Sequence, residues 1–209
     1  MIQGHPTDDM LAAYAAGAAT EGVSLLVAAH LTYCGRCRRE VASLEAIAGA
    51  MLRSAPAAEP PSLDRAFALL DAPEAPSPKP VRDAGPLPRP VADAVGAPFE
   101  QIRWRFRIPG VSEHEIDLGG AERVSLLRVR PGAGVPSHTH TAEEATLVLT
   151  GALQDRGARF GVGDVAVATP EDDHHPNAAP GEECVCLVVM AGNLRFTGAL
   201  GRALNLFAE

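Results

Sequence analysis

The sequence predicts two domains, a small all-α domain at residues 1–72 and an all-β domain at residues 99–209. Apolar residues recur at helical spacing in the first part, whereas the last part consists of short β-branched runs separated by Gly- and Pro-containing turns. Between them, residues 73–98 contain eight prolines. Because proline fixes φ and lacks a backbone N–H, this segment is expected to be an extended, semi-rigid linker without helix or sheet.

Four helices are expected before the linker. Thr7, followed by two aspartates, is typical of an N-cap, and Gly17 can end that helix. A second helix is expected from Thr20 to about Tyr33, and a third begins near Cys34. The fourth is a short helix that starts after the cap Ser62. The third and fourth helices carry apolar stripes that so small a bundle cannot bury, namely Val41, Leu44, Ile47, Ala48 and Met51, then Leu63, Phe67 and Leu70.

Five runs after the linker have the composition of strands: RWRFRI, VSLLRV, ATLVLT, DVAVAT and CVCLVVM. Short glycine-containing stretches such as PGAG and GVG separate them. Several short strands at this spacing predict a β-sandwich or a small barrel.

Composition limits the classes of function. A net charge of −8 and a pI near 5.4 argue against direct nucleic-acid binding, which requires a basic face, and suit a basic protein partner better. No export signal and no run of about 20 apolar residues is visible, so a cytoplasmic protein without membrane association is expected. In that setting, the four cysteines favour metal binding or redox chemistry over a disulfide scaffold.

The segment HLTYCGRCRRE contains a candidate zinc site. His30 is expected to lie one helical turn before Cys34, and Cys37 follows three residues later, so the three side chains can face one tetrahedral ion. A structural site needs a fourth ligand, and His5 is the remaining His or Cys among the first hundred residues. A thioredoxin-type pair would need a βαβ context, and haem attachment would need histidine where Arg38 stands. Two unrelated buried cysteines remain an alternative.

The segment GAGVPSHTHTAEEATLVLTG contains a second candidate metal site. His138, His140 and Glu144 fall at even offsets, so in one extended strand they would share a face. A further imidazole is expected from His174 or His175 on a facing strand. Such ligands suit Zn²⁺, Mn²⁺, Fe²⁺ or Ni²⁺.

Three other side chains are given simpler roles. His114 is interpreted as a surface residue. Cys184 and Cys186 are interpreted as small buried hydrophobes, with oxidation near a redox-active metal left open.

Residues 132–151 match the first cupin motif: a glycine, five residues, His-x-His, three residues, Glu, six residues and a glycine. The second cupin motif is partly present, since Gly163, Asp164 and Pro170 fit but Asp172 stands where a glycine is expected. The resemblance implies a cupin fold, a double-stranded β-helix or jelly roll.

The N-terminal half resembles the zinc-binding anti-sigma domain, with its histidine, three residues and Cys-x-x-Cys, and an upstream histidine. Joined to a cupin, it resembles the ChrR type of anti-sigma factor over essentially the whole chain. The resemblance implies zinc at His5, His30, Cys34 and Cys37. It also implies a divalent metal in the cupin, with zinc preferred and manganese, iron or nickel left open, held by His138, His140, Glu144 and His174 in preference to His175.

The same resemblance implies a function without catalysis. The helical domain would sequester a group IV, extracytoplasmic-function (ECF) sigma factor, and the cupin would govern its release under oxidative stress such as singlet oxygen. One alternative is a cupin dioxygenase or isomerase, although the motif offers no evident acid/base partner. Another is a redox-labile zinc switch at Cys34 and Cys37. The sequence leaves the oligomeric state open.

Overall fold

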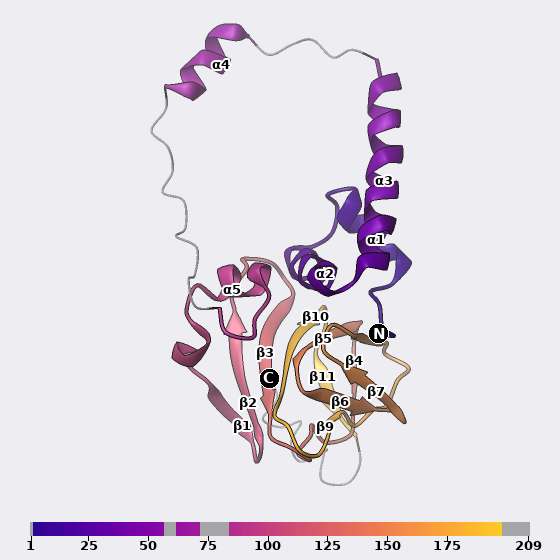
Figure 1. Cartoon of the computed structure of the whole chain (residues 1–209), viewed down its shortest axis with the longest axis vertical. Coiled ribbons are helices and arrows are strands. Elements are labelled where there is room, and N and C mark those ends of the chain that lie inside the picture. The colour runs from indigo at the N-terminus through magenta and orange to yellow at the C-terminus, as the bar shows by residue number, and fades with distance from the viewer. Residues whose placement is uncertain (1, 57–61, 72–83, 198–209) are drawn as a thin grey trace.

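The computed structural model describes residues 2–56, 62–71 and 84–197 (Figure 1). Five α-helices and one short 3-10 helix lie in these ranges: α1 (Asp8–Ala15), α2 (Glu21–Tyr33), α3 (Gly35–Ser54), α4 (Leu63–Leu70), α5 (Arg89–Val95) and η1 (Phe99–Gln101). None of the described helices has the length and apolar character needed to cross a membrane.

The first four helices begin where the sequence places their caps. The hydroxyl groups of Thr7, Thr20 and Ser62 each accept a hydrogen bond from a backbone N–H three residues later. Cys34 caps α3 in the same way, because its sulfur accepts from the N–H of Cys37 at 3.5 Å. These caps satisfy donors that the first turn of a helix leaves unpaired, and the four predicted helices are confirmed.

Helix α5 differs from the expectation for the proline-rich segment. Pro90 occupies the first turn, where a missing N–H costs nothing, and Gly96 ends the helix with a φ of 69°. Val91 and Ala92 are fully buried, and the helix packs on α2. The expectation that prolines exclude a helix from 73–98 is therefore wrong for residues 89–95. Residues 73–83 lie outside the described ranges, and the domain boundaries at 72 and 98 stay a prediction.

The second half of the chain is all-β, which confirms the predicted fold class. Six strands form one antiparallel sheet in the order β1-β2-β3-β10-β5-β8, while β7-β6-β9 and β11-β4 form two smaller sheets. The strand bounds are β1 (Arg105–Ile108), β2 (Val111–Ile116), β3 (Arg123–Val129), β4 (His138–His140), β5 (Glu144–Thr150), β6 (Ala152–Asp155), β7 (Ala158–Gly161), β8 (Val165–Ala168), β9 (Asn177–Ala178), β10 (Cys184–Met190) and β11 (Leu194–Phe196).

The helices and the large sheet share one hydrophobic core. Leu26 and Val27 of α2 are fully buried in the same cluster as residues of β3, β5 and β10. The approach is close at Gly22, where an added Cβ would lie 2.8 Å from Val124 and 2.9 Å from Val189. A second cluster, which includes Val111, lies within the β half. Helix α2 is thus packed onto the sheet, and α1 and α5 pack against α2.

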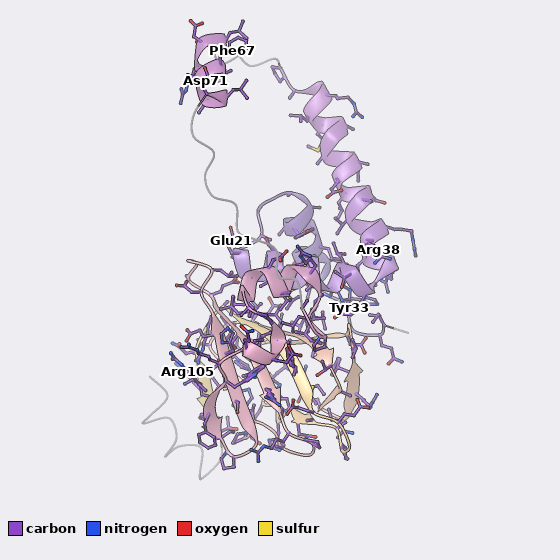
Figure 2. All side chains as sticks on the ribbon, turned by 60° about the vertical axis from the view of Figure 1, so that its left-hand side comes forward. Glu21, Tyr33, Arg38, Phe67, Asp71 and Arg105 are labelled. Carbon is purple, nitrogen blue, oxygen red and sulfur yellow. The ribbon has the colours of Figure 1, made fainter. Side chains whose placement is uncertain are left out.

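The far end of α3 and the whole of α4 expose apolar side chains. In Figure 1, α3 projects away from the sheet, and Figure 2 shows Phe67 of α4 far from Arg105 of β1. No residue of α4 is buried. The exposed apolar surface, called here the α3/α4 face, comprises Ile47, Met51, Leu52, Leu63, Phe67, Leu69 and Leu70, each at least 60% exposed.

Candidate metal centres

The first candidate centre joins four ligand atoms from three parts of the helical region. His5 precedes α1, His30 lies in the last turn of α2, and Cys34 and Cys37 surround the start of α3. Their ligand atoms lie within 4.8 Å of one another. All but His5 are buried, and His5 is half-buried. The structure therefore brings together the four residues that the sequence predicts.

The sulfur-to-nitrogen distances in this His/Cys cluster fit a tetrahedral zinc ion. Nδ1 of His5 lies 3.6 Å from the sulfur of Cys34 and 3.4 Å from that of Cys37. Zinc with bonds of about 2.3 Å to sulfur and about 2.0 Å to nitrogen places a bound sulfur and nitrogen about 3.5 Å apart.

His30 presents its other ring nitrogen to the cluster. Its Nδ1 lies 2.8 Å from the carbonyl oxygen of Gly163, which can only accept, so Nδ1 carries the proton and Nε2 keeps a lone pair. Within the described residues, this buried Nε2 has no hydrogen-bond partner. Burial lowers the pKa of the ring and favours the neutral form. An unpartnered buried lone pair is what an ion would satisfy.

The Cys37 thiol also depends on a cation for its charge. Burial, followed by the hydrogen bond to Cys34, raises the pKa of Cys37 to about 12. Without a cation this thiol stays protonated at neutral pH. A divalent ion supplies the positive charge that stabilises thiolates in such an apolar position.

The second candidate centre lies inside the β half. His138 and His140 lie on β4 and Glu144 begins β5. His174 pairs with His138 through an isolated β-bridge. The ligand atoms of these four buried residues lie within 4.8 Å of one another. The structure thus places His174 in the cluster, whereas its neighbour His175 is exposed.

The route by which Glu144 reaches this His/Glu cluster differs from the expectation. The even spacing predicts one extended strand with His138, His140 and Glu144 on a single face. Instead, β4 ends at His140, residues 141–143 interrupt the strand, and β4 and β5 belong to different sheets. Thr141 stabilises the interruption, since its N–H donates to the carbonyl of Asn193 and its hydroxyl accepts from the N–H of Asn193. The expected common face holds for the two histidines and is wrong for Glu144.

Hydrogen bonds orient two of the imidazoles toward the centre of the cluster. Nδ1 of His138 donates to the carbonyl of Pro136 at 2.7 Å, and Nδ1 of His174 donates to Asp155 at 2.9 Å. Both rings therefore direct Nε2 inward. Nε2 of His140 lies 2.9 Å from that of His174 and 3.6 Å from a carboxylate oxygen of Glu144.

The electrostatics of the His/Glu cluster suit a divalent cation. Burial lowers the pKa values of His138 and His140 to about 4, so both rings are neutral at neutral pH and can act as ligands. Burial raises the pKa of Glu144 to about 7, although the charge on His174 and the hydrogen bond from Thr146 act in the opposite direction. A bound divalent ion would add the positive charge that favours the carboxylate.

Sequence reasoning missed the buried carboxylate of Asp155. It is 4% exposed, lies at the end of β6 and contacts both His174 and Arg156. Burial alone would raise its pKa, but these two partners lower it below the ordinary value. The residue belongs to no motif, and only the pairing of β6 with β9 brings it near His174, so no local sequence signal identifies it.

The other cysteines and the isolated histidine lie outside both clusters. Cys184 and Cys186 are buried in the second hydrophobic cluster with their sulfur atoms 3.5 Å apart, which agrees with a packing role. Hydrogen bonding to Cys184, together with burial, raises the pKa of Cys186 and keeps it as a thiol. His114 is half-buried, with Nδ1 3.2 Å from the carbonyl of Arg103.

Comparison with known proteins identifies the family. Residues 93–194 match the family described as the ChrR cupin-like domain. Over 209 residues the chain is 40% identical to the anti-sigma-E factor ChrR of Cereibacter sphaeroides, covering 99% of this chain and 98% of that protein. The chain belongs to the ChrR family of anti-sigma factors. The similarity runs through both candidate metal centres and confirms the resemblance drawn from the motifs.

A solved structure agrees with this membership. The chain superposes with a TM-score of 0.78 and 37% identity on a chain of the crystal structure of Rhodobacter sphaeroides SigE in complex with the anti-sigma ChrR. The match covers 91% of this chain and 99% of that one. The ChrR architecture of N-terminal helices followed by a cupin is therefore common to the two proteins.

Proposed function

We propose that this protein binds an ECF-type sigma factor in the cytoplasm, holds it away from RNA polymerase, and releases it under oxidative stress. The main support for this proposal is the 40% identity to an anti-sigma factor along the whole chain. Regulation of this kind acts by occlusion and requires no catalytic residue and no contact with DNA. Singlet oxygen and related oxidants are the proposed signals, read by the cupin.

The α3/α4 face is the proposed contact with the sigma factor. Its seven side chains are large and apolar, and they lie on two helices that extend beyond the shared core. Clusters of large exposed apolar side chains, as each of these two helices carries, are typical of protein-binding sites. A masking partner that covers it would bury these side chains together.

The His/Cys cluster is proposed to hold zinc as a structural ion. Zinc bound by His5, His30, Cys34 and Cys37 would tie the segment before α1 to the junction of α2 and α3. In small zinc modules, metal binding contributes directly to folding. The ion would thus fix the start of α3, the helix that carries part of the α3/α4 face.

The His/Glu cluster is proposed to hold the sensory metal. Three imidazoles and a carboxylate from His138, His140, Glu144 and His174 accept several divalent ions. Zinc is our first choice, with manganese, iron and nickel as the alternatives that metal analysis would separate. A metal there would supply a positively charged, Lewis-acidic centre in a buried site.

Capture of the sigma factor tests the proposal. The full zinc-loaded chain is mixed with the ECF sigma factor of its own host, and binding is measured by calorimetry. We expect Phe67→Asp to weaken binding at least 100-fold, since it places a charge in the apolar contact. Phe106→Asp is the matched control, because Phe106 is 72% exposed on β1, in the other half of the chain. Absence of binding by the unaltered chain, or equal effects of both substitutions, would contradict the proposal.

A further inference from the structure

The turn between β7 and β8, residues 161–165, lies against the His/Cys cluster of the helical region. The carbonyl oxygen of Gly163 in this turn accepts the Nδ1 hydrogen bond of His30. That single contact selects the ring tautomer and directs Nε2 toward the two cysteines. A carbonyl from the β half therefore orients a ligand of the helical half.

Asp164 in the same turn holds the segment that leads into His5. One carboxylate oxygen accepts from the N–H groups of Gln3 at 2.6 Å and Gly4 at 3.0 Å, and the other accepts from the N–H of Gly161 at 2.8 Å. Asp164 is 6% exposed. Each of these N–H groups stabilises the carboxylate, so the side chain ties the turn and the N-terminal segment together.

The N-terminal segment also extends the edge of the large sheet. The N–H of Val165 donates to the carbonyl of Gly4 at 3.1 Å, beside β8, the last strand in the sheet order. The contact is so close that a Cβ on Gly4 would lie 2.4 Å from the carbonyl oxygen of Val165. A Cβ on Gly163 would likewise lie 2.6 Å from Ile2 and 2.8 Å from Tyr33. The approach leaves no room for these segments to slide.

The turn is connected to the His/Glu cluster through the β5–β8 ladder. Glu144 pairs with Ala168 at one end of this ladder, and Leu147 pairs with Val165 at the other. Beyond that end, Val148 exchanges backbone hydrogen bonds with Gly163 and Asp164. Three residue steps span roughly 10 Å, so a ligand of one cluster and the supports of the other share one short ladder.

We propose that the β7–β8 turn supplies the outer support of the zinc site, with Asp164 as a positioning residue, and couples the two metal clusters. Occupancy of the His/Glu cluster then changes how tightly the His/Cys cluster holds zinc, and the coupling is reciprocal. The inference rests on the proposed function and specifies how a change in the cupin reaches the helices.

Zinc release from the full chain tests the positioning role. Transfer of zinc to a colorimetric chelator is followed in the unaltered chain, Asp164→Ala, Asp164→Asn and the control Asp117→Ala, which removes an exposed aspartate of a β-half turn. Loss of outer-shell partners typically weakens metal binding 10- to 100-fold. We expect release at least 10-fold faster for Asp164→Ala and an intermediate rate for Asp164→Asn, which keeps one oxygen for Gln3 and Gly4.

A spectroscopic measurement separates positioning from general loss of structure. In the cobalt-loaded chain, the sulfur-to-cobalt charge-transfer band reports on the His/Cys cluster alone, since the His/Glu cluster has no thiol. We expect Asp164→Asn to shift this band while the far-ultraviolet circular dichroism stays unchanged. An unshifted band with an unaltered release rate in this variant would overturn the positioning role.

The coupling is tested by combining Asp164→Asn with Glu144→Gln in a double-mutant cycle. We expect Glu144→Gln to change zinc release from the His/Cys cluster at least threefold in the unaltered background and to have no effect beside Asp164→Asn. If the double variant changes the release rate by the product of the two single effects, the substitutions act independently and the coupling is overturned. Sigma binding is not part of this measurement, so failure of the proposed function and failure of this inference give different results.

Discussion

At the residue scale, both metal clusters depend on which imidazole nitrogen carries the proton. Backbone carbonyls fix His30 and His138, while a carboxylate fixes His174, so each of these rings turns Nε2 inward. Local spacing predicts three ligands of each cluster, whereas His5 is predicted as the remaining histidine of the first hundred residues and His174 from the family resemblance. The sequence does not predict these hydrogen-bond partners, because Gly163 is 133 residues from His30 and Asp155 acts from another strand.

The role of Asp155 gives a prediction for the His/Glu cluster. Asp155→Asn removes the negative charge behind His174, which weakens the ring as a ligand. We expect the affinity of this cluster for zinc to fall 10- to 100-fold, while the His/Cys cluster keeps its ion. The zinc affinity of each cluster is measured separately by competition titration with a chelator. Asp117→Asn is the control, and an equal loss in both variants would contradict the role.

At the element scale, local patterns identified the helices that begin with a polar cap. Thr7, Thr20 and Ser62 lie where predicted, because capping needs only residues within one turn. The remaining elements, helix α5 and the short strands, depend on tertiary packing. Helix α5 forms despite its prolines because Val91 and Ala92 are buried. Strand β2 carries polar residues on a half-exposed face, and β4, β6, β7, β9 and β11 are each four residues or fewer, too short for a clear alternating pattern.

The start of α3 supports a prediction about stability. Replacing Cys34 and Cys37 with alanine removes two ligands and the sulfur cap of the helix. We expect loss of one zinc ion and of helical circular dichroism, because zinc contributes on the order of 10 kcal/mol to folding in small zinc modules. The apolar contact of α2 with the sheet limits the loss to the helical region.

The control for this variant replaces the chain's other two thiols. Cys184→Ala with Cys186→Ala also removes two buried sulfur atoms but no ligand of either cluster. Zinc content and helicity should stay unchanged in that variant. A Cys34/Cys37 variant that keeps its helices and still binds the sigma factor would disprove the structural role of zinc.

At the scale of the whole molecule, the helical region and the cupin form one packed body in which α3 and α4 extend outward. Composition predicts an extended linker between the two halves, because it does not show that α2 packs on the sheet and α5 packs on α2. This packing brings the β7–β8 turn to the His/Cys cluster. A change at the His/Glu cluster can therefore reach the helices through direct contacts.

The most direct test of the account is release of the sigma factor by singlet oxygen from a photosensitiser. The complex of the full chain with the sigma factor is illuminated, and dissociation is compared for the unaltered chain and Glu144→Gln. Before illumination, both chains are fully loaded with metal and with the sigma factor. The account predicts dissociation of the unaltered complex and retention of the sigma factor by Glu144→Gln. Equal release from both, which a switch at Cys34 and Cys37 would give, or no release from the unaltered complex, would contradict it.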